Sequence, residues 1–271
     1  MSPNKPVRVA VAGLGAVGRK VAAVLDDGFP GYELAAVSVR RPQRSQEFLS
    51  GLRNAPPVLP LSDLADVSDI VVECAPAAVL AELALPVLSA GKELIVLSSG
   101  ALLDNWDLVE EAERTGARIR VPTGALLALD AVQAAAQGSI SSVSMVTRKP
   151  LAGLSSAPFL AQHGIDLDGL TEARRLFSGT ARQAAEGFPA NLNVAVALSL
   201  AGIGPDRTKL EVWADPAITR NTHRIVVESD SARLDFTIEN IPTENAATGR
   251  ITALSVLALL RKMASSLQIG T

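Results

Sequence analysis

A glycine-rich loop directly after a short apolar run is the feature that most constrains this chain. Val7–Ala12 is rich in β-branched residues and predicts a strand, and Gly13, Gly15 and Gly18 follow it at the spacing G-x-G-x-x-G. In dinucleotide-binding folds the first glycine makes the tight turn, the second lets the backbone approach the pyrophosphate, and the third lets the helix pack close to the strand. The loop therefore predicts a dinucleotide site rather than a purely structural turn.

An amphipathic pattern over residues 16–25 predicts the helix that should follow this loop. The first N–H groups of such a helix are not used inside it, and they point toward a bound phosphate. We therefore expect Ala16 and Val17 to contact the cofactor together with the three glycines.

The residue that reads the cofactor ribose is expected about 20 positions beyond the turn, where an Asp or Glu would accept from the 2′-OH of NAD. At the end of the second apolar run, Glu33–Val39, the chain has Ser38, and Arg40 and Arg41 follow without an acid. Arginine pairs well with a 2′-phosphate, so the pattern favours NADP, or use of both cofactors, over strict use of NAD. The alternative is that Arg40 and Arg41 lie in an ordinary solvated loop.

Strands and helices alternate through the first 125 residues, as a doubly wound parallel sheet requires. Further strands are predicted over residues 69–75, 93–97 and 118–121, and helices over 77–90 and 104–115. The chain therefore belongs to the α/β class, with an N-terminal Rossmann domain expected over residues 1–124.

Two polar, glycine-containing segments follow strands of this sheet, Ser98-Ser99-Gly100 and Thr123-Gly124-Ala125. Ligands of open α/β sheets bind at the carboxyl ends of the strands. We therefore expect Ser99 and Gly100 to line the cofactor crevice, together with Ala75 at the end of the preceding strand. The alternative is that these segments are ordinary strand-to-helix turns.

The pattern changes beyond Ala125, where strands become more frequent. Strands are predicted over residues 139–147, 209–214, 224–229 and 234–239, a helix over 191–201, and short helical pieces over 171–177 and 181–185. This favours a second, α+β domain over residues 125–245 with a mixed or antiparallel sheet. The apolar segment 253–267 predicts a last helix within residues 246–271, packed back on the first domain.

Histidine is the natural proton carrier near neutral pH, and the sequence contains only His163 and His223. His163 is predicted in a loop, and His223 in a polar turn just ahead of a strand. His223 is the better candidate for catalysis, with a surface or packing role as the alternative. Zinc-ligand spacing and a G-x-S-x-G elbow are both absent from the sequence, so neither a zinc site nor a serine hydrolase is expected.

Two asparagines, Asn191 and Asn193, stand at the predicted start of a helix after Pro189. Asparagine is among the best residues for capping a helix N-terminus, which is the structural interpretation. An amide at this place is also suited to hold the carboxamide of a nicotinamide, which is the functional one.

Composition excludes several classes of partner. The net charge is −3, with 20% charged and 3% aromatic residues, so the chain lacks the basic field and the stacking surfaces of nucleic-acid binders. Its N-terminal residues lack a signal-peptide pattern, and no apolar run reaches the roughly 18 residues of a membrane span. With a single cysteine, Cys74, the chain is expected in the cytoplasm, without nucleic-acid or membrane partners.

Several segments together resemble one family, the NAD(P)-dependent L-aspartate dehydrogenases, over nearly the whole chain. Besides the glycine loop, they are Glu73-Cys74-Ala75, Pro122-Thr123-Gly124-Ala125 with Leu129-Asp130-Ala131, Phe188-Pro189-x-Asn191-x-Asn193-Val194-Ala195, Leu200-Ala201-Gly202, Ala214-Asp215-Pro216 with Asn221-x-His223, and Ile269-Gly270-Thr271.

The resemblance implies a Rossmann domain joined to a sheet domain, with His223 in the active site and with Ala125 and Asn191 or Asn193 at the cofactor. It implies oxidation of L-aspartate to iminoaspartate, which hydrolyses to oxaloacetate and ammonia, and it suggests the supply of iminoaspartate to NAD biosynthesis. The two carboxylates of such a substrate need cationic or N–H partners, for which Arg148, Lys149 and Arg220 are candidates. An open sheet in the second domain would also suit a homodimer.

The chain departs from the family pattern in two segments, Lys149-Pro150-Leu151 and residues 240–250. If either lines the substrate pocket, the substrate changes while the redox class does not. The alternatives are therefore an NAD(P)-dependent dehydrogenase or imine reductase for another small amino or oxo acid, and a non-catalytic dinucleotide sensor that needs no base.

Overall fold

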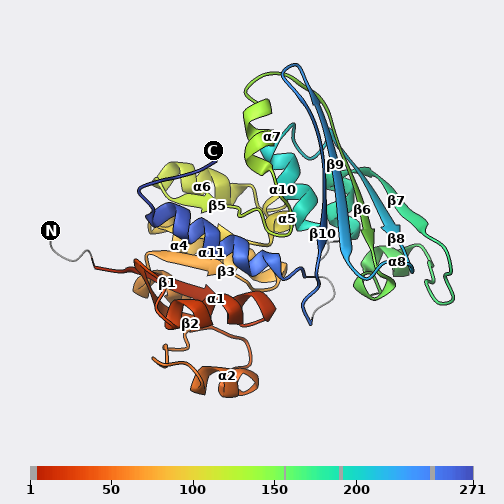
Figure 1. Cartoon of the computed structure of the whole chain (residues 1–271). Coiled ribbons are helices and arrows are strands. Elements are labelled where there is room, and N and C mark those ends of the chain that lie inside the picture. Colours follow the sequence, from red (N-terminus) through yellow and green to blue (C-terminus); the bar gives the residue numbers. More distant parts are fainter. Residues whose placement is uncertain (1–4, 156, 189–191, 245–247, 271) are drawn as a thin grey trace. The chain divides into compact units, whose positions relative to one another are not determined.

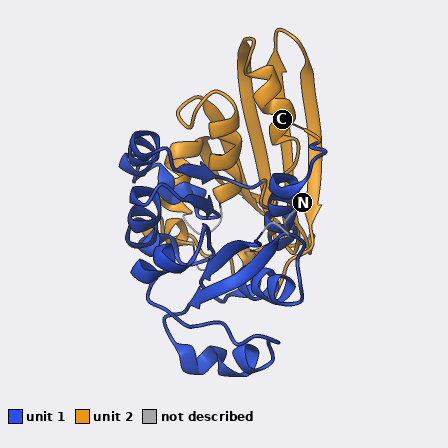
Figure 2. Ribbon diagram, turned by 90° about the vertical axis from the view of Figure 1, so that its left-hand side faces the viewer, with its two compact units in different colours: residues 1–122, 253–268 blue, residues 123–252, 269–271 orange. Residues whose placement is uncertain are grey.

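The computed structural model describes residues 5–155, 157–188, 192–244 and 248–270. The chain forms two compact units, residues 1–122 with 253–268 and residues 123–252 with 269–271, coloured separately in Figure 2. Each unit is built around a sheet of five strands. The expected class, a parallel Rossmann-like sheet followed by an α+β sheet domain, is confirmed.

Unit 1 contains a parallel sheet in the order β2-β1-β3-β4-β5, the doubly wound arrangement that the alternating pattern predicts (Figure 1). Its strands are β1 (Val7–Ala12), β2 (Tyr32–Ser38), β3 (Ile70–Glu73), β4 (Glu93–Val96) and β5 (Arg118–Arg120). Its helices are α1 (Ala16–Asp26), α2 (Gln46–Ser50), α3 (Leu64–Val67), α4 (Leu80–Ser89), α5 (Ser99–Leu102), α6 (Asp107–Thr115) and α11 (Ile251–Ala264), with 3-10 turns at Pro42–Ser45, Leu61–Asp63 and Ala77–Val79.

Alternation along β1 produces the two cores of unit 1. Val9 and Val11 pack with residues of α1 and α11 on one face, whereas Ala10 and Ala12 pack with residues of α3, α4 and α6 on the other. Because both faces are covered, the strands are almost continuously apolar. Helix α11 therefore returns to the first sheet as expected, and the Tyr32 hydroxyl donates to the Leu260 carbonyl at 2.7 Å.

Unit 2 contains a mixed sheet in the order β10-β9-β6-β8-β7, in which only β6 and β8 are parallel neighbours. Its strands are β6 (Ile140–Lys149), β7 (Arg174–Thr180), β8 (Thr208–Ala214), β9 (Asn221–Ser229) and β10 (Arg233–Asn240). Its helices are α7 (Leu129–Ala135), α8 (Pro158–Gln162), α9 (Ala181–Gly187) and α10 (Asn193–Ala201), with a 3-10 turn at Leu151–Gly153.

The sequence-based expectation of a short helix over residues 171–177 is wrong, because the chain forms β7 there. β7 pairs antiparallel with β8, from Arg174 opposite Ala214 to Thr180 opposite Lys209. The backbone groups along that side of β8 need partners, and pairing with β7 supplies them. This tertiary requirement overrides a weak local helical pattern.

Candidate active site

The glycine loop joins β1 to α1 in unit 1, and each glycine has a different environment. Gly13 has a φ of +95°, and a Cβ there would lie 2.5 Å from the Cys74 carbonyl oxygen, so only glycine makes this turn without strain. A Cβ at Gly18 would lie 1.9 Å from the Gly13 carbonyl oxygen, whereas a Cβ at Gly15 would meet nothing within 4 Å. Gly15 therefore borders open space at the start of α1.

This loop fits a dinucleotide pyrophosphate. Gly15 is the residue before α1, and Gly15 and Ala16 are exposed while Val17 is half-buried. The N–H groups in the first turn of the 11-residue helix α1 therefore face solvent, and the adjacent Gly15 has no side chain to cover them. These are the residues that would hold the phosphates.

The other polar residues expected in unit 1 lie at the carboxyl ends of neighbouring strands. Register places Ala12 beside Glu73 and Glu73 beside Val96, so β1, β3 and β4 end at the same edge of the sheet. Ala75 is half-buried after β3, and α5 begins at Ser99, which is 1% exposed, followed by half-buried Gly100. The sheet thus brings Ala75, Ser99 and Gly100 to the edge that carries the glycine loop.

Glu73 organises this edge, a role that sequence analysis did not assign to it. Its carboxylate accepts from the N–H groups of Leu97 and Ser98 at 3.0 and 2.8 Å and from the Ser98 hydroxyl at 3.1 Å. Glu73 is 1% exposed, and burial raises the pKa of its carboxyl despite these hydrogen bonds. Glu73 therefore ties the end of β3 to the loop that leads into α5.

The end of β2 has the charge pattern that favours a 2′-phosphate. Ser38 is buried at the end of the strand and its carbonyl accepts from the Gly13 N–H at 2.8 Å, which places the β2 end beside the glycine loop. Arg40 and Arg41 follow directly and are both exposed. Both arginine side chains are therefore accessible to an anionic group. Their exposure is equally consistent with the alternative, an ordinary solvated loop.

In unit 2, one end of the buried face of the sheet is polar. The covered face of β6 carries Val143 and Met145 and then Thr147 and Lys149, and β9 likewise changes from Val227 and Ile225 to His223 and Asn221. Register places Thr147 opposite His223 and Asn240 of β10 opposite Asn221. These five buried polar residues, the polar row, are Thr147, Lys149, Asn221, His223 and Asn240.

His223 is the titratable centre of the polar row. It is 2% exposed, and its Nδ1 lies 2.8 Å from the Thr147 hydroxyl oxygen. Burial, together with the charge of Lys149, lowers its pKa to about 3. The imidazole is therefore neutral at pH 7, as a base must be before it accepts a proton.

Lys149 is the second unusual group of this row. It is 2% exposed, and burial lowers its pKa to about 8. Of the three cations considered for a substrate carboxylate, it is the one that the sheet places by His223. Arg148 instead pairs with Asp215 at 3.3 Å and stacks on Trp213, and Arg220 pairs with Glu239 at 3.4 Å.

The remaining candidates of unit 2 have separate positions. The half-buried Ala125 accepts a hydrogen bond at its carbonyl from Asn240 Nδ2 at 2.8 Å, and within the described chain Asn240 Oδ1 is buried without a partner. Asn193 is half-buried as the first residue of α10. Asn191 lies outside the described residues, so its role at the cofactor stays a prediction.

The two histidines differ from their expected local settings. His223 does not lie in a turn ahead of a strand: β9 begins at Asn221, because the whole of residues 221–229 pairs with β10 and β6. The exposed His163 ends α8, where it stacks on Phe159 at 3.9 Å. His163 therefore has none of the buried polar surroundings of His223.

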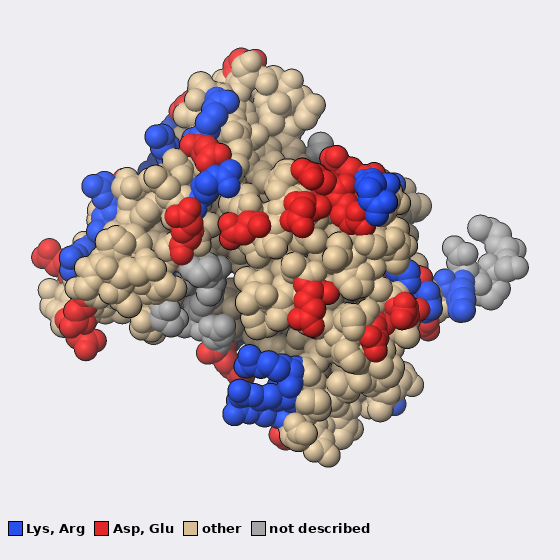
Figure 3. Space-filling model, turned by 180° about the vertical axis from the view of Figure 1, so that it is seen from behind, with Lys and Arg blue, Asp and Glu red and all other residues tan. Residues whose placement is uncertain are grey.

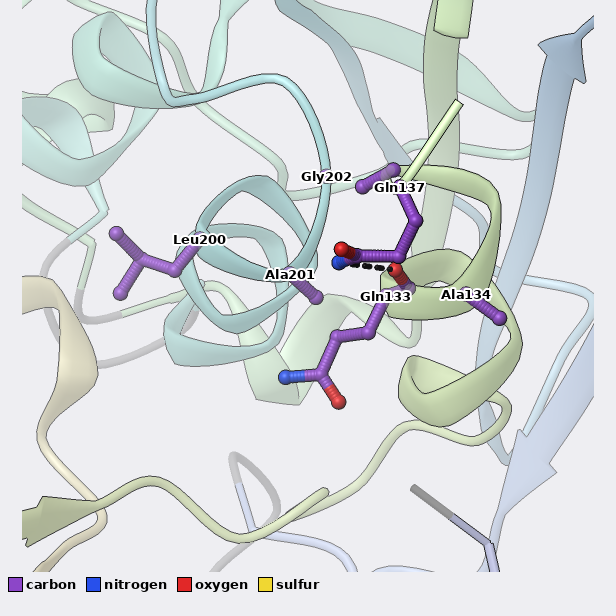
Figure 4. A pocket seen from close by; sticks show the side chains of 7 residues that line it. Gln133, Ala134, Gln137, Leu200, Ala201 and Gly202 are labelled. Carbon is purple, nitrogen blue, oxygen red and sulfur yellow. Dashed lines mark hydrogen bonds between the residues drawn. The ribbon is translucent and has the colours of Figure 1, made fainter. Parts of the chain in front are cut away.

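A shallow groove lies elsewhere in unit 2, between the end of α7 and the end of α10 (Figure 4). Its volume is about 530 Å³, and Gln137 Nε2 donates to the Gln133 carbonyl at its wall. Its lining has no titratable side chain, so the groove has no group for acid–base catalysis. The lining residues are Gln133, Ala134, Ala136, Gln137, Leu200, Ala201 and Gly202.

Other classes of site find little support in the described part of the chain. No group of three or more His, Cys, Asp and Glu side chains there is placed to hold a metal ion. None of the described helices combines the length and apolarity needed to cross a membrane. Basic and acidic side chains both occur over the face drawn in Figure 3.

Comparison with known proteins decides the family. Residues 130–263 match the family model of the aspartate dehydrogenase C-terminal domain, and residues 13–122 match that of the homoserine dehydrogenase NAD-binding domain. An L-aspartate dehydrogenase of Bradyrhizobium diazoefficiens is 60% identical over 268 residues, covering 99% of this chain and 95% of that protein. The chain belongs to the aspartate dehydrogenase family.

Other members of the aspartate dehydrogenase family are similar over their full lengths. L-aspartate dehydrogenase 3 of Bordetella bronchiseptica is 58% identical to this chain, and the alignment covers 100% of both proteins. The crystal structure of the Thermotoga maritima aspartate dehydrogenase aligns with a TM-score of 0.72 at 24% identity over 98% of this chain and 100% of that one, which shows the shared fold. The resemblance drawn from the sequence motifs is thereby confirmed.

Sequence analysis did not single out three residues of the polar row, Thr147, Asn221 and Asn240, as candidates for the site. Thr147 breaks the apolar alternation at the end of the strand predicted over residues 139–147, whereas Asn221 and Asn240 lie just outside the strands predicted over 224–229 and 234–239. The register that aligns the three residues is known only from the tertiary structure.

Proposed function

We propose that this protein is an NAD(P)-dependent L-aspartate dehydrogenase that interconverts L-aspartate and iminoaspartate, with oxaloacetate and ammonia formed by hydrolysis. The observation that carries the mechanism is the buried, neutral His223 at the polar end of the unit 2 sheet. The full-length similarity to curated L-aspartate dehydrogenases supports the choice of substrate.

A bound oxidised nicotinamide would supply the acceptor for the hydride of the substrate α-carbon. We assign the removal of a proton from the substrate ammonium to His223, so that the nitrogen lone pair becomes available to form the C=N bond as the hydride leaves. In the reverse direction the protonated imidazole returns that proton to nitrogen. Lys149, as a buried ammonium, is our candidate for pairing with a substrate carboxylate.

We assign cofactor contacts to residues of both units. In unit 1 they are Gly13, Gly15, Ala16, Val17 and Gly18 for the phosphates, Arg40 for a 2′-phosphate, and Ala75, Ser99 and Gly100 at the strand ends. In unit 2 they are Ala125, Asn193 and, outside the described residues, Asn191. Open space at Gly15 and the exposed arginine after β2 support NAD or NADP, with NADP favoured or both used.

The first test measures the absorbance of reduced nicotinamide in four mixtures: L-aspartate with NAD or NADP, and oxaloacetate plus ammonia with NADH or NADPH. We expect turnover in at least one cofactor pair in both directions. Cofactor binding without turnover in all four mixtures would contradict aspartate as substrate, and would point to another small amino or oxo acid or to a cofactor sensor.

The second test replaces the proposed base. His223→Ala should retain cofactor binding, measured by the fluorescence of bound NADPH, while kcat falls about 10²- to 10⁴-fold, the usual effect of removing a general acid or base. His163→Ala is the control, because His163 is exposed at the end of α8. If His223→Ala turned over aspartate as fast as the control, His223 would have no part in the mechanism.

We also propose a homodimer in the cytoplasm, acting on a dicarboxylic amino acid. Support for the dimer comes from the open five-stranded sheet of unit 2, whose edge strands could pair with those of a second copy. Light scattering would measure the mass in solution, and a value equal to one chain of 28.2 kDa would exclude the dimer.

A further inference from the structure

Thr147 holds the ring of His223 from across the sheet. The two residues are 76 positions apart in sequence but directly opposite each other in the register of β6 and β9. The Thr147 hydroxyl oxygen lies 2.8 Å from His223 Nδ1, and Thr147 is 0% exposed. A hydroxyl this deeply buried is costly unless it is hydrogen-bonded, and the imidazole nitrogen is the partner it has.

The contact decides which ring nitrogen is left for chemistry. With Nδ1 engaged by Thr147, Nε2 is the nitrogen that remains for a proton of the substrate. For Nε2 to act as a base it must have a free lone pair, so the single proton of the neutral ring must be on Nδ1, where Oγ1 accepts it.

We propose that Thr147 is a positioning residue that orients His223 and keeps Nδ1 hydrogen-bonded throughout the reaction, so that Nε2 exchanges the proton. The Thr147 hydroxyl oxygen accepts from Nδ1–H in both states of this exchange, the neutral ring with a free Nε2 and the imidazolium formed when Nε2 takes the proton. The inference rests on the proposed role of His223.

The arrangement also differs from one that stabilises a protonated histidine. A buried carboxylate at Nδ1 would stabilise the imidazolium, as it does in Ser-His-Asp triads. Here the partner is neutral and the nearby charge, that of Lys149, disfavours the imidazolium. Thr147 therefore fixes the geometry of the ring without converting it to a resident cation.

The test uses Thr147→Val, which keeps the side-chain shape and removes the hydroxyl, and Thr147→Ser, which keeps the hydroxyl. In Thr147→Val we expect kcat to fall about 10- to 100-fold, the size of effect usual for groups that orient a functional histidine, with the KM for aspartate changed less than about twofold. Thr147→Ser should recover most of kcat. NADPH binding and the melting temperature of both variants show whether the fold is retained.

A second readout does not depend on activity. The chain has two histidines, so nitrogen-15 NMR of the imidazoles in a His163→Gln background reports His223 alone. We expect one predominant tautomer of His223, with Nδ1–H, in the parent and in Thr147→Ser, and a changed tautomer distribution in Thr147→Val.

Two results would overturn the inference: an unchanged tautomer and kcat in Thr147→Val, or a loss of kcat in Thr147→Ser as large as in Thr147→Val. Absence of aspartate oxidation by the parent enzyme would instead count against the proposed function, while the NMR comparison would still test the contact.

Discussion

At the residue scale, side chains of the same type have very different surroundings. His163 and His223 have the same ring, yet one is exposed at a helix end and the other is buried opposite Thr147. Likewise Arg148 and Arg220 are engaged in ion pairs with Asp215 and Glu239, while Arg40 is exposed after β2. Residue type alone therefore does not predict these surroundings.

The choice of cofactor is predicted to depend on Arg40. Arg40→Ala should weaken NADPH binding about 10- to 100-fold and NADH binding far less, because a charge-assisted hydrogen bond contributes roughly 1.5–3 kcal/mol and only NADPH has the 2′-phosphate. Dissociation constants from nicotinamide fluorescence measure the effect. Arg53→Ala, which removes an exposed arginine paired with Asp27, is the control. Equal losses for both cofactors would leave Arg40 without a role in the preference.

At the element scale, the β1–loop–α1 segment combines two separate requirements. Gly18 is needed for packing, since a Cβ there would collide with the Gly13 carbonyl oxygen, whereas Gly15 faces open space. The same three-glycine motif therefore contains one residue that the packing requires, Gly18, and another, Gly15, that we propose for the ligand.

A pair of substitutions separates these requirements. Gly18→Ala should destabilise the protein by about 1–3 kcal/mol or more, because a Cβ has no room there. Gly15→Ala should change the free energy of unfolding by less than about 1 kcal/mol, since its φ of −77° suits any residue, but should weaken cofactor binding at least about tenfold. Urea unfolding and cofactor titration measure the two effects. A normal cofactor affinity in Gly15→Ala would show that the pyrophosphate does not bind against Gly15.

At the scale of the whole molecule, the polar row makes stability depend on pH. His223 titrates near pH 3 in the folded protein, against an ordinary value of 6.5 in the unfolded chain. Between these values the unfolded chain binds a proton that the folded protein does not, so the free energy of unfolding falls as the pH is lowered, by up to about 1.4 kcal/mol per pH unit. Above about pH 6.5, His223 is neutral in both the folded and the unfolded protein, so it no longer makes the free energy of unfolding depend on pH.

Replacing His223 should therefore flatten the acid side of the stability profile. We expect His223→Leu to lose less stability between about pH 6.5 and 4 than the parent does, although other groups still titrate there. Urea unfolding at several pH values gives the slopes, with His163→Leu as the control. Parallel slopes in the parent and His223→Leu would contradict the neutral, buried state of His223.

Lys149→Met should remove a rise in the free energy of unfolding between about pH 8 and 10.5, because the Lys149 pKa is lowered to about 8 in the folded protein.

The amino-acid sequence by itself was enough to predict the parallel unit, its glycine loop and the return of the last helix. These features depend on signals that are close together along the chain: apolar runs, the spacing of Gly13, Gly15 and Gly18, and the alternation of strands with helices. The family resemblance likewise came from short motifs, and the assignment of His223 as the catalytic residue remains a prediction from them.

Only the tertiary structure decided the contacts between distant segments. Residues 174–180 form a strand because β8 needs a neighbour, and Thr147 meets His223 because β6 and β9 pair in one register. Burial of Lys149 and the lowered pKa of His223 follow from that pairing. Strand pairing depends on hydrogen bonds and packing between segments far apart in the chain, which local patterns do not specify.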